Sequence, residues 1–165
     1  MRVRTLKGLV CKQASPEAVV AALNLRDRVT FEELLTKVTA AHGKPIELQD
    51  IDNTVIPTVT GLWIETTAKS MILLPAGDHK LHRIHAVCHE FGHMLLGHES
   101  CGGIDAAMPS IFRHVGGRRG IKQMLARSLG WNETEQAAER VAYLLSSAML
   151  PKEPESPNGF ERTFT

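Results

Sequence analysis

Residues 85–98 read His-Ala-Val-Cys-His-Glu-Phe-Gly-His-Met-Leu-Leu-Gly-His, and this stretch decides the fold. Apolar residues recur at helical spacing from Leu81 to Leu96, and Gly97 follows, as glycine often does where a helix ends. The pattern therefore predicts a helix that ends at Gly97. Because this helix is apolar on almost every side, we expect it in the core rather than at the surface.

The same helix carries the residues of a metal site. His89 and His93 are four positions apart, so both imidazoles can direct a nitrogen at one zinc ion about 2.0 to 2.1 Å away. Glu90 would face the same cavity and act as the general base, taking a proton from a water molecule that zinc has made acidic. Burying these side chains in an apolar helix is costly unless a metal or other partners compensate them. The pattern predicts zinc-dependent hydrolysis of a peptide bond.

A catalytic zinc site needs a third protein ligand and an open position for water. A third histidine six residues after the second would stand at position 99, which is Glu99, and His98 misses that position by one. A later helix offers Glu133, Glu135 and Glu139 instead, and the residues alone leave Glu135 and Glu139 both open as the ligand. The alternative is that these glutamates only favour the start of a helix, where negative charge is stabilising.

The rest of the chain predicts an α+β fold. Ser15-Pro16 and the Thr30/Glu33 pair are typical helix starts, so helices are expected over residues 16–25 and 31–42. Short runs typical of strands then predict a small, mainly antiparallel, three-stranded sheet, built from residues 45–48, 60–66 and 70–74. The run from Gly61 to Glu65 is interpreted as a core strand, with an edge strand that accepts an extended peptide as the alternative.

Two more helices are expected towards the end of the chain. One is short, over residues 121–129, and the last runs from Glu133 to about Met149, with Asn132 as its cap. The sequence predicts one domain over residues 1–151 and a disordered tail over 152–165.

The residues around the motif resemble the ImmA/IrrE family of cytoplasmic zinc metallopeptidases. The resemblance is specific over residues 85–98, and it extends to 135–142 and 149–151. It implies a minimal zincin-like fold in which the motif helix packs against a C-terminal ligand helix. It also implies a gluzincin-type site with Glu135 as third ligand, and Glu139 matches a polar position beside that site.

The resemblance also implies a substrate class. Members of this family cleave regulatory proteins, often helix-turn-helix repressors, in phage, toxin-antitoxin or stress-response circuits. The expected partner is therefore a protein substrate of that kind. The competing hypothesis is a non-catalytic, zinc-containing regulatory or binding module of such a system.

Several other residues are candidates for roles near the metal. His98, His114 and Tyr143 are candidates to stabilise the oxyanion or to surround the site, since that task needs a hydrogen-bond donor near the carbonyl oxygen. His82 and His85 are interpreted as surface groups or as neighbours of the metal site. Cys88 adjoins a ligand but is interpreted as a small apolar core residue.

Composition limits the function classes. The 19 Lys and Arg nearly balance the 18 Asp and Glu, so direct binding of nucleic acid is not expected, and the basic stretch 113–127 is interpreted as a solvated loop. Three cysteines without a Cys-x-x-Cys pair favour a reducing cytoplasm over a disulfide framework. No apolar run approaches the ~20 residues of a membrane span, so no membrane association is expected.

Overall fold

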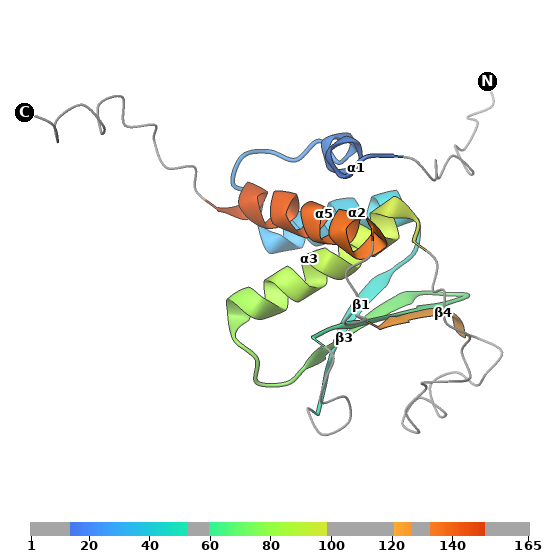
Figure 1. The fold of residues 1–165 in the computed structure, drawn as a ribbon. Coiled ribbons are helices and arrows are strands. Elements are labelled where there is room, and N and C mark those ends of the chain that lie inside the picture. The colour runs from blue at the N-terminus through green and yellow to red at the C-terminus, as the bar shows by residue number, and fades with distance from the viewer. Residues whose placement is uncertain (1–13, 53–59, 99–120, 127–132, 151–165) are drawn as a thin grey trace, which may run out of the picture.

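The computed structural model describes residues 14–52, 60–98, 121–126 and 133–150. Within them the chain forms an α+β fold, as predicted, with four helices on one side of a small sheet (Figure 1). The tail from 152, residues 113–120 of the basic stretch and the cap residue Asn132 lie outside the described residues. No helix in the described part of the chain is both long and apolar enough to span a bilayer.

The first two helices begin at the expected caps. Helix α1 (Pro16–Ala22) starts where the Ser15 hydroxyl accepts a hydrogen bond from the Ala18 amide, but it ends earlier than predicted, and Asn24 follows with a positive φ of 48°. Helix α2 (Phe31–His42) has the predicted bounds. Its capping box is complete, and Gly43 ends it in the left-handed conformation, which glycine adopts without strain.

The sheet has four strands in the order β1-β3-β2-β4. Its strands are β1 (Ile46–Ile51), β2 (Leu62–Thr66), β3 (Ser70–Pro75) and β4 (Ile121–Ala126). The β1–β3 pairing is parallel and the other two pairings are antiparallel, so the sheet is mainly antiparallel, as predicted. The three predicted strands are all present, and β4 adds a fourth. The prediction of a helix over 121–129 was wrong, because residues 121–126 pair with β2.

Strand β2 lies inside the sheet. It pairs with β3 on one side and with β4 on the other, and Leu62, Trp63 and Ile64 are all buried. The core-strand interpretation is therefore confirmed, and the alternative of an edge strand was wrong.

Two antiparallel helices, α3 (Lys80–Leu96) and α5 (Glu133–Met149), form the centre of the helical layer (Figure 1). Both were predicted with nearly these bounds. They approach so closely that a Cβ built on Gly92 would lie 2.7 Å from the carbonyl oxygen of Ala138. The absence of a side chain at Gly92 is what allows this crossing.

The core lies between the helices and the sheet. Successive side chains of a strand point to opposite faces, so Trp63, Ile72 and Leu74 reach the helical layer. There they join buried residues of the helices that pack on them, such as Leu34 and Phe91, both fully buried. This packing holds α3 between the sheet and α5, with the motif residues in its middle.

Candidate metal centre

Three donor atoms converge where α3 and α5 meet. His89 Nε2 lies 3.0 Å from His93 Nε2 and 3.2 Å from Glu135 Oε2, and His93 Nε2 lies 3.5 Å from Glu135 Oε1. A tetrahedral zinc site with bonds of about 2.0 to 2.1 Å separates its ligand atoms by roughly 3.3 Å. The three separations scatter around that value, so this buried group could hold a metal ion.

The local folding explains the convergence. His89 and His93 stand one turn apart on α3, and Glu135 lies in the first turn of α5, directly across the crossing at Gly92. The two histidines are 2% and 1% exposed, whereas the Glu135 side chain keeps 14% of its surface in solvent. The two histidines are therefore buried, and Glu135 is the member of the group that keeps contact with solvent.

Glu90 follows His89 on α3 and is buried as well. It is 2% exposed, and its carboxylate lies against the backbone that leads into β2, where a Cβ on Gly61 would be 3.2 Å from Glu90 Oε1. Sequence reasoning treated Gly61 as part of an ordinary strand and missed this contact. The sequence did offer one signal, because a glycine at the start of a strand often marks a place where another group comes close to the backbone.

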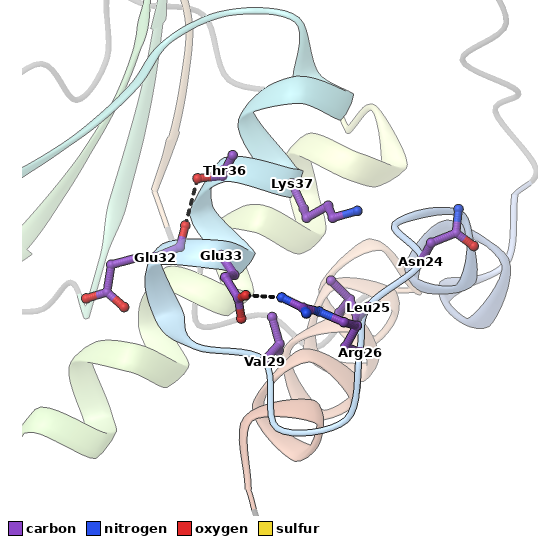
Figure 2. Close-up of a pocket in the computed structure, with 8 residues that line it drawn as sticks. All are labelled: Asn24, Leu25, Arg26, Val29, Glu32, Glu33, Thr36 and Lys37. Atoms are coloured by element: carbon purple, nitrogen blue, oxygen red, sulfur yellow. Dashed lines mark hydrogen bonds and ion pairs between the residues drawn. The ribbon is translucent and has the colours of Figure 1, made fainter.

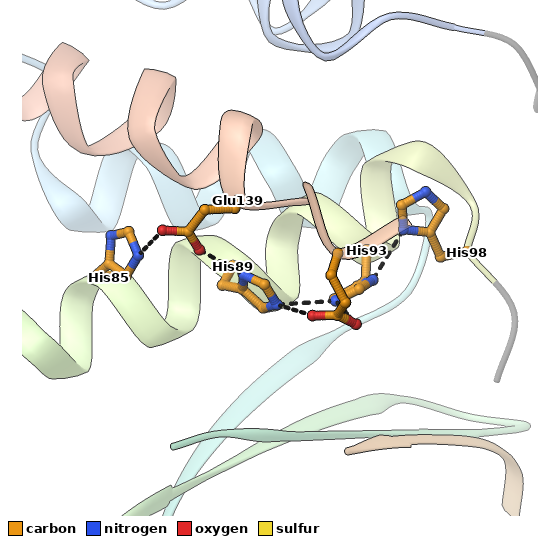
Figure 3. A network of polar contacts seen from close by, with 6 residues as sticks. His85, His89, His93, His98 and Glu139 are labelled. Carbon is orange, nitrogen blue, oxygen red and sulfur yellow. Dashed lines mark hydrogen bonds and ion pairs between the residues drawn. The ribbon is translucent and has the colours of Figure 1, made fainter. Parts of the chain in front are cut away.

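Glu139 occupies a different place from Glu135. Its carboxylate bridges two imidazoles, with Oε1 2.9 Å from His85 Nε2 and Oε2 3.1 Å from His89 Nδ1 (Figure 3). Burial alone would raise the pKa of Glu139, but His85 and His89 outweigh it and hold this pKa below its usual range. Of the two glutamates that the sequence left open, Glu135 joins the donor group, and Glu139 contacts the opposite nitrogen of His89.

His98 contacts His93 at Nδ1, the ring nitrogen that is not part of the donor group. The two Nδ1 atoms are 2.9 Å apart, so His98 lies at the ring nitrogen of His93 that faces away from His89 (Figure 3). Burial, and next the nearby His89, lower the pKa of His98, which favours its neutral form. This position does not match the oxyanion role considered from sequence.

The remaining sequence candidates lie elsewhere. Tyr143 is 60% exposed on α5, with the Arg140 guanidinium 5.7 Å from its ring centre, and His114 lies outside the described residues. The His82 side chain is 78% exposed and faces Asp78. Among the described residues, neither His82 nor Tyr143 joins the three-donor group.

Cys88 precedes a member of the donor group but points into the core. It is fully buried, and burial raises the pKa of its thiol to about 12, although contact with Ser146 acts in the opposite direction. A thiol this basic is neither a good nucleophile nor a ready metal ligand. The interpretation of Cys88 as a small apolar residue is confirmed.

A cavity of about 460 Å³ lies away from the donor group. It is formed by α2 and by the segment that joins α1 to α2, and Arg26 pairs with Glu33 at its wall (Figure 2). The exposed Arg26–Glu33 pair stabilises little, as surface ion pairs usually do. None of the residues that line this cavity belongs to the donor group, so the convergent histidines, and not the cavity, mark the candidate site.

Comparisons of the chain with protein-family models, with curated proteins and with solved structures return no match. The resemblance to the ImmA/IrrE family therefore stays a prediction from the motif residues. The geometry of the donor group is the main basis for assigning a function to the chain.

Proposed function

We propose that this protein is a zinc-dependent endopeptidase. The observation that carries the proposal is the convergence of His89, His93 and Glu135 at separations suited to tetrahedral zinc. Glu90, which follows His89 in the chain, is buried as well. Two imidazoles and one carboxylate form a donor set that zinc commonly binds in hydrolytic enzymes.

The proposed reaction divides the work between metal and protein. When bound, zinc supplies Lewis acidity, which polarises a peptide carbonyl and makes water acidic enough to attack near neutral pH. Glu90 would accept the proton from that water on its carboxylate and later donate it to the leaving amine. Glu90 is 2% exposed and lies close to Gly61, so its carboxylate has little room to change position.

The donor group has the composition expected of a catalytic metal site. Structural zinc sites have four protein ligands, whereas catalytic sites keep one position open. His98, the nearest further imidazole, approaches Nδ1 of His93 and not the point where the three donors converge. Within the described residues, the donor group contains three members and no fourth.

The proposed substrate is a regulatory protein, such as a helix-turn-helix repressor or an antitoxin-type partner, in the cytoplasm. This part of the proposal depends on the resemblance of residues 85–98 and 135–142 to the ImmA/IrrE family. The nearly neutral charge of the chain is compatible with a protein substrate and gives no preference for nucleic acid.

The first test is the Glu90→Gln variant, which keeps the shape of the side chain and removes its basicity. Wild-type protein loaded with zinc should cleave members of a peptide library, with new termini identified by mass spectrometry. The variant should keep about one zinc per chain and lose cleavage by roughly 100-fold or more, the usual contribution of a general base.

The matched control is Glu133→Gln, which changes an exposed glutamate of α5 in the same way. It should keep both zinc and cleavage. Cleavage that persists at the wild-type rate in Glu90→Gln would contradict the mechanism, and a wild-type chain that binds zinc but cleaves nothing in the library or in co-expressed regulators would contradict the proposed function.

A further inference from the structure

The end of α3 folds back onto the donor group. His93 is followed by Met94, Leu95, Leu96 and Gly97, and then by His98. Gly97 has φ 65° and ψ 33°, its amide donates to the Met94 carbonyl, and the His98 amide donates to the His93 carbonyl at 2.9 Å. These two bonds form a Schellman motif, the helix end that a left-handed glycine allows.

The turn brings two side chains together as well as two backbone groups. Because the backbone of His98 is bonded to the carbonyl of His93, its imidazole lies over the same residue, with the Nδ1 atoms 2.9 Å apart (Figure 3). The two rings meet at an interplanar angle of 64°, with centroids 5.1 Å apart. His98 is half-buried, so this contact is sheltered from competing water.

The protons in this contact can be assigned from what surrounds His93. Its Nε2 faces His89 Nε2 and Glu135 Oε1, so it must present a lone pair if it is to bind a metal. A neutral His93 then carries its proton on Nδ1 and donates it towards His98. His98 Nδ1 must accept that hydrogen bond, and its own proton is placed on Nε2.

We propose that His98 is a positioning residue that fixes the orientation and the tautomer of His93 through the contact between their Nδ1 atoms. This inference depends on the proposed zinc site and goes beyond it by assigning a role to the helix end. His89 is restrained in the same way by Glu139, so each histidine of the donor group is held at Nδ1 by a different segment. Partners of this kind typically change metal affinity by 10- to 100-fold when removed.

Three substitutions separate this role from simple packing. In His98→Asn, the side-chain oxygen can take the place of Nδ1 and accept the same hydrogen bond. In His98→Asp, a negatively charged carboxylate can accept the same hydrogen bond. His98→Leu has a similar volume but accepts nothing. Zinc affinity, measured by competition with a chelator, should fall by 10- to 100-fold in the Leu variant and by less than about threefold in the Asn variant, and it should be retained or increased in the Asp variant.

The control substitution is His82→Leu, which removes an exposed imidazole from the same helix and should leave zinc affinity unchanged. Long-range proton–nitrogen spectra of the zinc-loaded wild type should show the proton of His93 on Nδ1 and that of His98 on Nε2. Urea unfolding of the metal-free variants measures any general loss of stability, so a drop in affinity with unchanged unfolding supports the inference.

The outcomes distinguish the inference from the function that it depends on. Wild-type zinc affinity in His98→Leu would overturn the positioning role alone. A His93 proton on Nε2 in the zinc-loaded protein would overturn it together with the proposed donor group, because a protonated Nε2 cannot bind zinc. Equal losses in the Asn and Leu variants would also overturn it, because packing and not hydrogen bonding would then explain the effect. A wild-type chain that takes up no zinc would overturn the proposed function together with this inference.

Discussion

Gly61 controls the space beside Glu90. Its φ lies outside the left-handed region, so the backbone at this position would accept a side chain, and the nearest atoms to a new Cβ belong to the side chains of Glu90 and Ala86. A methyl group there would press on Glu90 Oε1 at 3.2 Å, which is closer than ordinary van der Waals contact. The carboxylate would have to move by a few tenths of an ångström.

We therefore expect Gly61→Ala to reduce cleavage about tenfold, because small misplacements of a catalytic group are costly. Zinc content should stay near one per chain, since the new methyl group does not meet His89, His93 or Glu135. The comparison needs steady-state cleavage rates and zinc analysis on the same samples. Wild-type activity in this variant would show that the position of the Glu90 carboxylate does not depend on Gly61.

His42 is one residue through which pH should act on stability. It is partly buried, its Nε2 lies 2.8 Å from the Ser70 hydroxyl, and its ring packs edge-on near Trp63. Burial lowers its pKa from the usual 6.5, although Glu65 acts in the opposite direction. The folded protein therefore binds a proton at His42 less readily than the unfolded chain does.

The consequence is a stability contribution that is present above about pH 6.5 and is lost as the pH falls through the lower pKa of the folded state. In His42→Gln, whose amide can replace the contact with Ser70, the free energy of unfolding should decline less between pH 7.5 and 5.5 than it does in the wild type. Urea denaturation at both pH values measures the difference. A steeper decline in the variant would contradict the sign of this effect.

At the level of elements, the crossing of α3 and α5 makes the site. The crossing depends on Gly92, where a Cβ would meet the carbonyl oxygen of Ala138 at 2.7 Å and its Cα at 2.9 Å. These are backbone atoms of the fully buried residue Ala138, so the clash can be relieved only if the helices separate. Separation would also withdraw Glu135 from His89 and His93.

Gly92→Ala should therefore destabilise the protein by about 1 to 3 kcal/mol, as overpacked cores do, even though alanine favours a helix over glycine by about 1 kcal/mol. Zinc affinity should fall with stability. Gly61→Ala is the matched control, because it adds the same methyl group against side chains and should keep zinc affinity. Thermal unfolding and chelator competition measure both quantities, and unchanged values in Gly92→Ala would refute the close-packing argument.

The elements also show what the sequence could predict. Periodicity and capping residues predicted α2, α3 and α5 well, because those signals are local. Strand β4 was predicted as a helix since Lys122, Gln123, Met124, Leu125 and Ala126 are mostly good helix formers. Its pairing with β2 is a tertiary contact, and such contacts override local propensity.

The candidate site, too, was predictable only where it depends on local spacing. The spacing of His89 and His93 is local, so the motif predicted their convergence. The choice between Glu135 and Glu139 depends on where α5 crosses α3, which no local pattern encodes. His98 was a candidate either to stabilise the oxyanion or to surround the site, and helical spacing could not choose between these roles, because its contact with His93 depends on the left-handed turn at Gly97.

For the whole molecule, the proposed zinc would link α3 to α5. A ligand that binds only the folded state stabilises it by about 2.7 kcal/mol at 100 times its dissociation constant. In a chain of this size each kcal/mol changes Tm by about 2 to 4 °C, so removing zinc with a chelator should lower Tm by roughly 5 to 11 °C.

The change should be reversed by adding zinc back, and it should be much smaller in Glu135→Gln, which loses one donor, than in Glu133→Gln, which loses none. Differential scanning calorimetry with and without chelator provides the measurement. Identical Tm values for the wild type in both conditions would argue against a tightly bound metal in the folded protein.

The separation of the three donors along the chain also has a consequence for synthesis. His89 and His93 leave the ribosome together, whereas Glu135 lies 42 positions after His93. At about 5 to 20 residues per second, roughly two to eight seconds pass before the last donor is made, and α5 must then fold back across Gly92. A nascent chain would carry two donors without the third during that interval. A protease assembled in this order would be unable to cut neighbouring polypeptides until Glu135 had been made and α5 had folded onto α3.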